Sequence, residues 1–365
     1  MVIKILSLKD FRNYEAELFE FSEGVNVLYG NNGQGKTNVL EAISLACTTK
    51  SHRKARDEEI IQFGKDESHI TLGMVKREID VRIDMHLRRK MKKAVSINSQ
   101  LIRRSSELLG LANIVFFSPE DLNLVKNGPS ERRRFIDLEA CQLDRLYMDD
   151  LINYNKCLLQ RNHLLKNTRM SHIDDTVSAS LDVWDDKMSR HAIGLINSRE
   201  KFVQQLNEII NPIHKSLTGS NEEIRLEYSP DTSKEEYKAR LEKTRDKDLK
   251  VASTTIGPHR DDIIFLLNGM NLRKYGSQGQ QHTVSLALKL SEIELVKRHA
   301  KDNPVLLLDD VLSELDSKRQ KYLLQVIGNI QTVMTCTGLD EFVKNNFDID
   351  KVFLIEHGSI SLKQA

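Results

Sequence analysis

Residues Gly30 to Thr37 carry the pattern G-x-x-x-x-G-K-[ST], which matches at every fixed position. In this pattern the backbone N–H groups of a glycine-rich loop wrap a phosphate, the lysine reaches the β- and γ-phosphates, and the hydroxyl binds Mg²⁺. Chance produces the pattern in roughly one chain in a hundred of this length. The alternative is a glycine-rich turn that binds nothing. The predicted nucleotide-binding residues here are Gly30, Asn31, Asn32, Gly33, Gln34, Gly35, Lys36, Thr37 and Asn38.

The segments on either side of this loop are expected to form a strand and a helix that hold it in place. Residues 25–29 are apolar enough to form a buried strand, and the apolar residues of 39–46 recur at helical spacing. A helix that begins at the end of the loop adds the partial positive charge of its N-terminus to the phosphate site.

A pair of carboxylates forms the second candidate group. The segment 304–310 holds consecutive apolar residues followed by Asp309 and Asp310, which is typical of a buried parallel strand that ends in acids. We expect Asp309 to hold Mg²⁺, either through water or together with Thr37, and Asp310 to orient the attacking water. The predicted catalytic residues are therefore Lys36, Asp309 and Asp310.

A third group lies between these two in the sequence. The segment 277–281 looks like the signature loop of ABC-type ATPases, and 313–316 resembles the D-loop of that class. The resemblance implies that Ser277, Gln278, Gly279 and Gln280 cap the γ-phosphate of ATP held by a second copy of the chain. It also implies an α/β fold of the ABC-type ATPase head, a P-loop NTPase with an inserted helical lobe.

Apolar residues at helical spacing over 143–158 and 181–209 predict two long helices, which form a short antiparallel helical hairpin in that lobe. Pro212 is expected to close the hairpin, and the charged segment 219–250 to be peripheral. We predict a discontinuous nucleotide-binding lobe of residues 1–110 and 300–365, with the helical lobe at 111–299.

Composition limits the class of protein. The 365 residues are 39% hydrophobic and 29% charged, with a formal net charge of only +1. No run reaches the roughly 18 apolar residues of a membrane span, and the four cysteines show no zinc or disulfide spacing. We expect a cytoplasmic protein with no membrane partner.

With so little net charge, any DNA surface must come from local clusters. The candidate DNA-binding residues are Arg53, Lys54, Arg56, Arg88, Arg89 and Lys90. For the first three the alternatives are contact with the nucleotide phosphates or a solvated loop. For the last three the alternative is a solvated hairpin tip. Arg132 to Arg134 either contact DNA or hold the helical lobe together through Glu131, Asp137 or Glu139. The roles of His259 and Arg260 stay open.

The whole chain resembles the bacterial RecF family of DNA repair ATPases. The resemblance rests on the motifs already described and on segments 8–14, 117–122, 131–135 and 257–262. It implies an ATP-dependent homodimer that binds double-stranded DNA at gap junctions, acts with RecO and RecR in loading a recombinase, and is linked to replication and the SOS response.

Three departures from the wider ABC pattern suggest slow turnover. Asp310 stands where many ABC ATPases have Glu, the segment 334–337 lacks a switch histidine, and no Q-loop glutamine is identifiable. The alternatives are an SMC-type chromosome-maintenance head, the ATPase subunit of a transporter, and a binding protein with an inactive nucleotide site.

Overall fold

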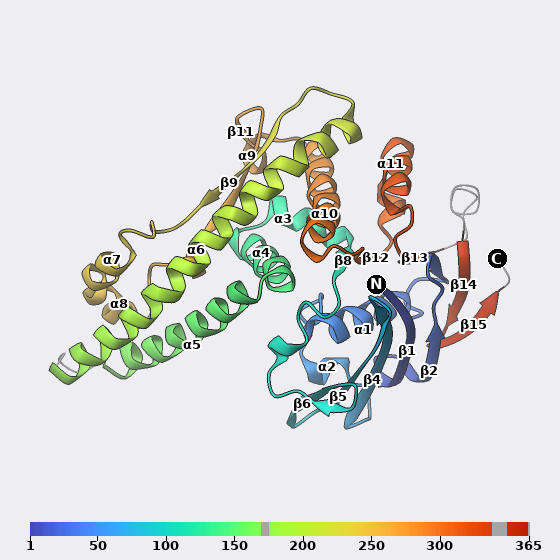
Figure 1. Cartoon of the computed structure of the whole chain (residues 1–365), viewed down its shortest axis with the longest axis horizontal. Coiled ribbons are helices and arrows are strands. Elements are labelled where there is room, and N and C mark those ends of the chain that lie inside the picture. The colour runs from blue at the N-terminus through green and yellow to red at the C-terminus, as the bar shows by residue number, and fades with distance from the viewer. Residues whose placement is uncertain (169–174, 338–348, 364–365) are drawn as a thin grey trace. The chain divides into compact units, whose positions relative to one another are not determined.

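The computed structural model describes residues 1–168, 175–337 and 349–363, and the chain divides into two compact units. Unit 1 comprises Met1–Asp121 and Lys289–Ala365, and unit 2 comprises Leu122–Leu288 (Figure 1). The sequence placed these divisions at 110/111 and 299/300. The segment after residue 110 lies in unit 1 because β8 (Ile114–Phe117) pairs with β12 (Val305–Leu308) of that unit.

Unit 1 contains a six-stranded antiparallel sheet in the order β2-β1-β4-β5-β6-β7. Apolar residues alternate with polar ones along its long strands, so that one face is buried and the other is solvated. Its strands are β1 (Val2–Phe11), β2 (Tyr14–Glu20), β4 (Glu67–Lys76), β5 (Ile79–Arg88), β6 (Met91–Ile97) and β7 (Gln100–Leu101).

The second sheet of unit 1 has the order β15-β14-β3-β13-β12-β8 and is parallel except for the β14–β15 pair. Because parallel strands share one carboxyl edge, residues that follow β3, β12 and β13 lie at the same edge. The remaining strands are β3 (Val25–Tyr29), β13 (Thr332–Cys336), β14 (Ile349–Glu356) and β15 (Ser359–Lys363).

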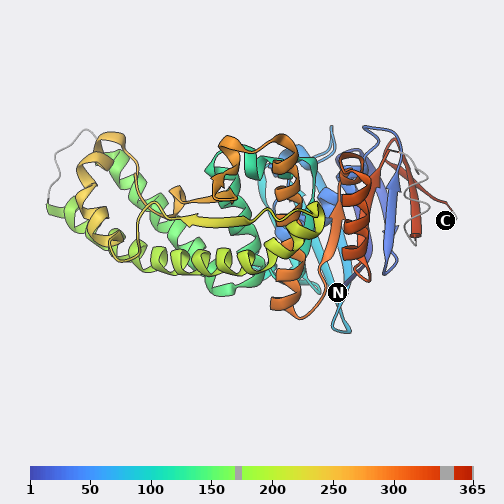
Figure 2. The same cartoon turned by 90° about the horizontal axis from the view of Figure 1, so that it is seen from above.

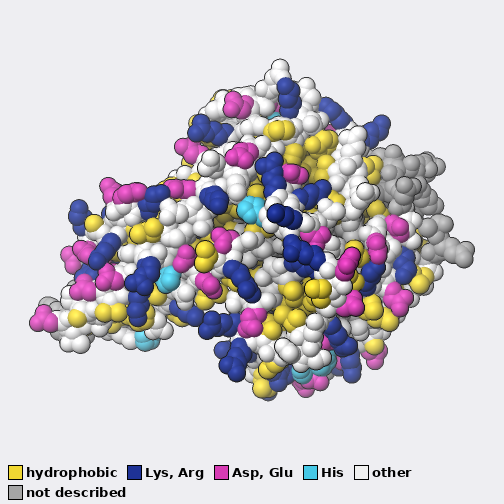
Figure 3. All heavy atoms as spheres, viewed as in Figure 1, with side chains coloured by type: hydrophobic (Ala, Val, Ile, Leu, Met, Phe, Trp, Pro, Cys, Tyr) yellow, Lys and Arg dark blue, Asp and Glu magenta, His cyan; other side chains and the backbone are white. Residues whose placement is uncertain are grey.

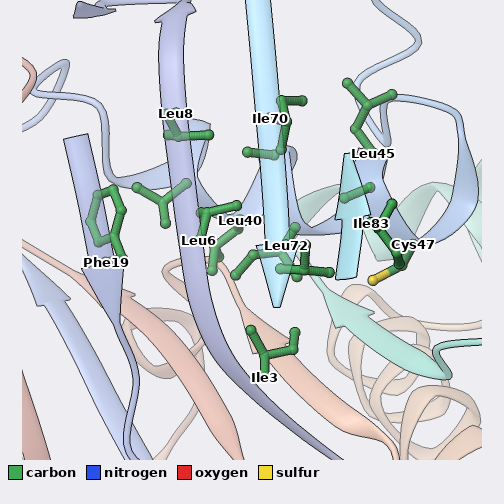
Figure 4. Close-up of a cluster of buried hydrophobic side chains, with 14 of the residues drawn as sticks. Ile3, Leu6, Leu8, Phe19, Leu40, Leu45, Cys47, Ile70, Leu72 and Ile83 are labelled. Atoms are coloured by element: carbon green, nitrogen blue, oxygen red, sulfur yellow. The ribbon is translucent and has the colours of Figure 1, made fainter. Parts of the chain in front are cut away.

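Helix α1 (Lys36–Thr48) packs against strands of both sheets and is buried over most of its surface. Figure 4 shows Leu40, Leu45 and Cys47 of this helix among apolar side chains of the antiparallel sheet. Every residue of the helix from Val39 to Thr48 is buried, including Glu41, whose charge is paired with Arg12. The other helices of this unit are α2 (Asp57–Ile60), α11 (Ser317–Ile327) and the 3₁₀ turns η1 (Ser105–Glu107) and η4 (Val311–Glu314), with η2 (Pro119–Leu122) at the division.

Unit 2 is built on the expected helical hairpin. Helix α5 (Arg145–Thr168, 24 residues) and α6 (Asp175–Thr218, 44 residues) pack side by side (Figure 1), and α6 can be followed along its length in Figure 2. The sequence predicts a polar turn around Asn167 to Asp175, and residues 169–174 of it lie outside the described residues. The expectation that Pro212 closes the hairpin is wrong, because α6 continues through it to Thr218. A proline removes one backbone donor, and the long packed face of α6 outweighs that loss.

The charged segment after α6 is not peripheral, which corrects the sequence expectation. It supplies β9 (Ile224–Ser229) to the antiparallel sheet β11-β10-β9, and Tyr237, Leu241 and Asp248 are fully buried. Helix α10 (Gln278–Ala300) crosses the division into unit 1. The remaining elements of unit 2 are α3 (Asn123–Lys126), α4 (Pro129–Leu143), α7 (Tyr237–Lys243), α8 (Arg245–Val251), η3 (Pro258–Arg260), β10 (Asp262–Leu267), β11 (Met270–Asn271) and α9 (Leu272–Tyr275).

Buried ion pairs hold unit 2 together. Arg199 of α6 donates to Asp261 and Asp137, each at 2.8 Å, and Arg161 of α5 donates to Asp185 and Asp248, each at 2.7 Å. Removing one member of such a pair leaves an uncompensated buried charge, which costs about 3–5 kcal/mol.

The arginine cluster left open by the sequence is part of this framework. Arg132 donates to Asp262 at 2.6 and 3.0 Å, and Arg133 donates to the Asp261 carbonyl at 2.7 Å. These two arginines therefore join α4 to the start of β10, through aspartates that the sequence had not suggested. His259 is also internal, with Nδ1 2.7 Å from the Tyr154 hydroxyl.

The four cysteines, Cys47, Cys141, Cys157 and Cys336, are all buried. Within residues 1–168, 175–337 and 349–363, no helix combines the length and apolar character needed to cross a membrane.

Candidate nucleotide site

The loop between β3 and α1 has a backbone that only glycine accommodates at two positions. Gly30 has φ +150°, and a Cβ there would lie 2.3 Å from the Ile355 carbonyl oxygen. Gly35 has φ +118°, and a Cβ there would lie 2.6 Å from the Asn13 amide. These contacts fix the turn that carries the loop from the carboxyl end of β3 into the N-terminus of α1.

Asn13 and Tyr14, at the turn between β1 and β2, brace this loop. The Asn13 amide donates to the Gln34 carbonyl at 2.7 Å and accepts from Asn38 at 2.8 Å. The Tyr14 hydroxyl donates to the Gly35 carbonyl at 3.0 Å. The sequence did not assign these roles, although both residues stand in one of the segments that carried the family resemblance.

Lys36 is almost fully buried, and its ammonium donates to the carbonyls of Gly30 at 2.6 Å and Asn31 at 3.0 Å. The side chain thus curls back along the loop, with its charge inside the loop's concave backbone. A cation in that place can reach phosphate oxygens that the loop N–H groups hold.

The two predicted metal ligands, Thr37 and Asp309, lie within hydrogen-bonding distance of each other. The Thr37 hydroxyl donates to Asp309 Oδ1 at 2.7 Å, and Thr335 of β13 donates to the same oxygen at 2.9 Å. The backbone N–H of Asp310 donates to the Thr335 hydroxyl at 2.9 Å. Thr335 therefore orients both Asp309 and Asp310. Sequence reasoning missed this role and noted only that the segment 334–337 lacks a switch histidine.

Burial raises the pKa of the Asp309 carboxyl above its usual range, against the hydrogen bonds from Thr37 and Thr335. A carboxylate that is partly desolvated in this way gains from a nearby cation. Asp310 adopts the left-handed region, with φ +49°. Such backbone conformations in non-glycine residues are concentrated at functional sites.

The donor set fits Mg²⁺. Two neighbouring ligands of an octahedral Mg²⁺ lie roughly 3.0 Å apart, close to the 2.7 Å between Thr37 Oγ1 and Asp309 Oδ1. Both are oxygen ligands, which this ion prefers. The loop, Lys36 and this oxygen pair together supply what a magnesium-bound nucleoside triphosphate needs.

A buried ion pair anchors the helix behind the loop. Arg12 donates to both carboxylate oxygens of Glu41, at 2.9 and 2.8 Å, and Ser51 donates to the same group. Burial would raise the pKa of Glu41, but these hydrogen bonds and the Arg12 charge outweigh it and leave the pKa below its usual range. Glu41 is fully buried on α1, so the pair fixes α1 against the β1–β2 turn.

A pocket of about 630 Å³ opens beside the loop. It is lined by Arg12, Asn13, Asn38, Glu58, Glu59, Ile61, Phe63 and Arg89. Phe63 is 99% exposed, which is unusual for so large an apolar side chain. The pocket has the size of a small-molecule site and combines an aromatic ring, cations and carboxylates.

The signature segment caps its own helix in unit 2. The Ser277 hydroxyl accepts from the backbone N–H of Gln280 at 3.3 Å, and the Gln280 side chain accepts from the Ser277 N–H at 3.0 Å. This reciprocal arrangement is the capping box that starts a helix, here α10. Gln280 also donates to Glu222 at 2.9 Å, while a Cβ added at Gly279 would meet no atom within 4 Å.

The candidate DNA-binding residues differ in their surroundings. Arg53 donates to Asn38 at 3.1 Å, which places it beside the phosphate loop. The Arg56 backbone N–H donates to Glu59 at 2.8 Å in the cap of α2. Arg89 donates to the Lys65 carbonyl at 2.6 Å and lines the pocket, whereas Lys90 is exposed. On the face drawn in Figure 3, Lys and Arg side chains lie among Asp and Glu side chains.

Comparisons with known proteins show the family of this chain. The model of the RecF/RecN/SMC N terminal domain family matches residues 2–360. The chain is 52% identical over 362 residues to the DNA replication and repair protein RecF of Agathobacter rectalis, covering 99% of each. The resemblance stated from the sequence is confirmed.

Two solved structures are also similar. One is the recombination mediator protein RecF with ATP in the RecFOR pathway, with a TM-score of 0.93 and 32% identity, covering 100% of this chain and 98% of that one. The other is the Smc head domain from Pyrococcus furiosus, with a TM-score of 0.58 and 16% identity, covering 99% and 96%. The predicted class, an α/β ATPase head of the ABC type, is confirmed, and at 16% identity the Smc likeness shows the fold alone.

Proposed function

The chain belongs to the RecF family of DNA replication and repair proteins, and we propose that it is a slow Mg²⁺-dependent ATPase that works as an ATP-assembled clamp on DNA. The observation that carries this proposal is the 2.7 Å hydrogen bond between Thr37 and Asp309. It joins the phosphate loop to the acid of β12, which is the pairing that a bound Mg²⁺–nucleotide requires.

In this proposal the loop from Gly30 to Asn38 holds the triphosphate through its backbone N–H groups and Lys36. Mg²⁺ supplies charge neutralisation of the phosphates when it is bound by Thr37 and Asp309. Asp310 accepts a hydrogen bond from the attacking water and orients it. The shorter reach of Asp compared with Glu is consistent with slow turnover, so that ATP acts more as an assembly signal than as fuel.

The base of the nucleotide occupies the pocket beside the loop. Phe63 offers an exposed ring for stacking, and Glu58, Arg12 and Arg89 offer polar contacts at its rim. Arg89 then acts on the nucleotide more than on DNA, and the solvent-exposed Lys90 stays a candidate for phosphate contact.

We propose that two copies assemble head to tail, with the Ser277 to Gln280 segment of one copy completing the ATP site of the other. The segment lies at the start of the 23-residue helix α10, which supports this role, since the N-terminus of a helix binds anions. Dissociation follows hydrolysis, because the product no longer presents a γ-phosphate to the signature segment.

The proposed target is duplex DNA at single-strand gaps in the cytoplasm, where the dimer helps load a recombinase during repair and replication restart. RecO and RecR are the proposed partners. A similar solved protein is described as a recombination mediator in the RecFOR pathway, which supports this assignment.

The test is the oligomeric state by analytical ultracentrifugation, with ATP-Mg²⁺, with ADP-Mg²⁺ and without nucleotide, each with and without duplex DNA. ATP should produce a dimer. Ser277→Arg should bind ATP but stay monomeric, and Lys36→Met should lose nucleotide binding itself. Ser216→Arg, the same change at another exposed serine of unit 2, is the matched control. A normal ATP dimer in Ser277→Arg would show that the head-to-tail arrangement is wrong.

A further inference from the structure

Three side chains with metal-ligating atoms converge on the solvated face of the antiparallel sheet, and none of the three is among the residues assigned above. Glu67 and His69 are alternate residues of β4, so they share a face, and His86 of β5 lies directly opposite His69 in the ladder. Their ligand atoms all lie within 4.8 Å of one another. Two strands thus present one carboxylate and two imidazoles to the same point.

The contacts within this group are close. His86 Nε2 lies 2.8 Å from Glu67 Oε2, His69 Nε2 lies 3.8 Å from Glu67 Oε1, and the two rings stack with their centroids 4.0 Å apart. The hydrogen bond from His86 lowers the pKa of the Glu67 carboxyl. The Glu67 carboxylate therefore lies beside the Nε2 atoms of both stacked rings.

We propose that Glu67, His69 and His86 form a binding site for a transition-metal ion, with Zn²⁺ as the physiological candidate. Imidazole nitrogens favour zinc, nickel and copper over Mg²⁺ and Ca²⁺, which prefer oxygen ligands. Two histidines and one glutamate form a known three-ligand set for zinc, with a fourth position left open to water.

The geometry needs only side-chain adjustment. Two ligand atoms of a tetrahedral zinc ion lie roughly 3.4 Å apart, between the 2.8 and 3.8 Å separations present here. The side chains are 55%, 43% and 31% exposed for Glu67, His69 and His86, so they are free to rotate without disturbing a core. The backbone register already places them correctly.

The alternative is that Glu67 only accepts hydrogen bonds from a stacked histidine pair. Neighbouring cations favour that alternative, because Lys9 is opposite His69 on β1 and Arg88 is opposite Glu67 on β5. A metal titration distinguishes the two interpretations, because a group that is only hydrogen-bonded would not bind a metal ion stoichiometrically.

The experiment is calorimetric titration of the full chain with ZnCl₂, without nucleotide and with excess Mg²⁺ to occupy the Thr37–Asp309 oxygens. One ion per chain is expected. His69→Ala and His86→Ala should each weaken binding by at least about tenfold, the least expected for a lost ligand. His191→Ala is the matched control, because His191 pairs with Asp150 of unit 2 at 2.9 Å and its loss should leave zinc binding unchanged.

Thermal melting separates loss of the site from loss of the fold. Zn²⁺ should raise the Tm of the wild type by mass action but not that of His86→Ala, while the two should melt alike without metal. Wild type loaded with Co²⁺ should show the visible absorption of a four- or five-coordinate ion. No stoichiometric zinc binding, or binding that survives both His69→Ala and His86→Ala, would overturn the proposal.

Discussion

Thr37 donates a hydrogen bond of 2.7 Å to Asp309 across 272 residues of sequence. The contact depends on two parallel strands, β3 and β12, whose carboxyl ends lie at one edge of the sheet with β13 between them. Thr335 of β13 completes the group from the strand in the middle. Substitutions of Asp309 and of Asp310 can therefore test metal binding and water orientation separately.

We expect Asp310→Asn to slow ATP turnover by about 100-fold or more, as for other losses of a general base, and to trap the ATP-bound dimer. Asp309→Asn should in addition weaken the dependence of nucleotide binding on Mg²⁺, because it removes a charged ligand. Steady-state turnover and nucleotide binding at graded Mg²⁺ concentrations measure the two effects. Unchanged turnover in Asp310→Asn would remove Asp310 from the mechanism.

Phe63→Ala should weaken ATP binding by about tenfold, which corresponds to roughly 1.4 kcal/mol of lost stacking and burial. Binding of inorganic tripolyphosphate should not change, because that ligand has no base. Calorimetry with both ligands makes the comparison. Equal affinity of wild type and Phe63→Ala for ATP would place the base elsewhere, whereas failure of wild type to bind tripolyphosphate would count against the phosphate loop itself.

Lys90→Ala combined with Lys92→Ala should weaken duplex binding equally across sequences. Lys90 is exposed in the β5–β6 turn and Lys92 is exposed at the start of β6, so their loss should leave the fold and the pocket intact. Each lost phosphate contact should lower the log–log salt slope by about 0.9. Fluorescence anisotropy over a range of salt concentrations gives the slope, and Lys238→Ala, at an exposed lysine of unit 2, is the control. An unchanged salt slope would show that this turn is solvated and does not contact DNA phosphates.

Glu41→Gln should lower the free energy of unfolding by about 3 kcal/mol at neutral pH, because it leaves Arg12 without its buried partner. The folded-state pKa of Glu41 is lowered, so its stabilising contribution is present above the unfolded-state pKa. That contribution is lost as the pH falls through the folded value, and the difference between variant and wild type should then shrink.

Denaturant unfolding at neutral and acid pH measures this pH dependence. Glu23→Gln, at an exposed pair with Lys4, is the control and should change little at either pH. An equal loss at both pH values in Glu41→Gln would assign its effect to packing instead of charge.

The sequence predicted the parts of the site whose chemistry requires a fixed residue type at a fixed spacing. The loop to Thr37 and the acid Asp309 belong to that class, since a phosphate cradle and a magnesium ligand leave few substitutes. Asn13 and Thr335 were missed as site residues. Their hydrogen bonds depend on how strands distant in sequence lie together, and neither residue type is diagnostic by itself.

The errors in the fold have a related cause. Pro212 was expected to end a helix on local grounds, but tertiary packing of α6 decides its length. The segment 219–250 looked peripheral because it is charged, yet Arg245 pairs with the buried Asp185 at 2.6 Å, and Asp248 accepts from Arg161. A charged side chain is therefore a sign of solvent exposure only where the folded chain offers it no buried partner of opposite charge.

The four buried cysteines have a practical consequence for studying assembly. Reaction with maleimide needs an accessible thiolate, and burial raises the pKa of Cys47 to about 12 and also raises that of Cys157. A single cysteine introduced at the exposed Ser216 could therefore carry a fluorophore while the native thiols stay in place. Mixing donor-labelled and acceptor-labelled chains would then report, by energy transfer and in real time, how long two copies stay together after ATP is added.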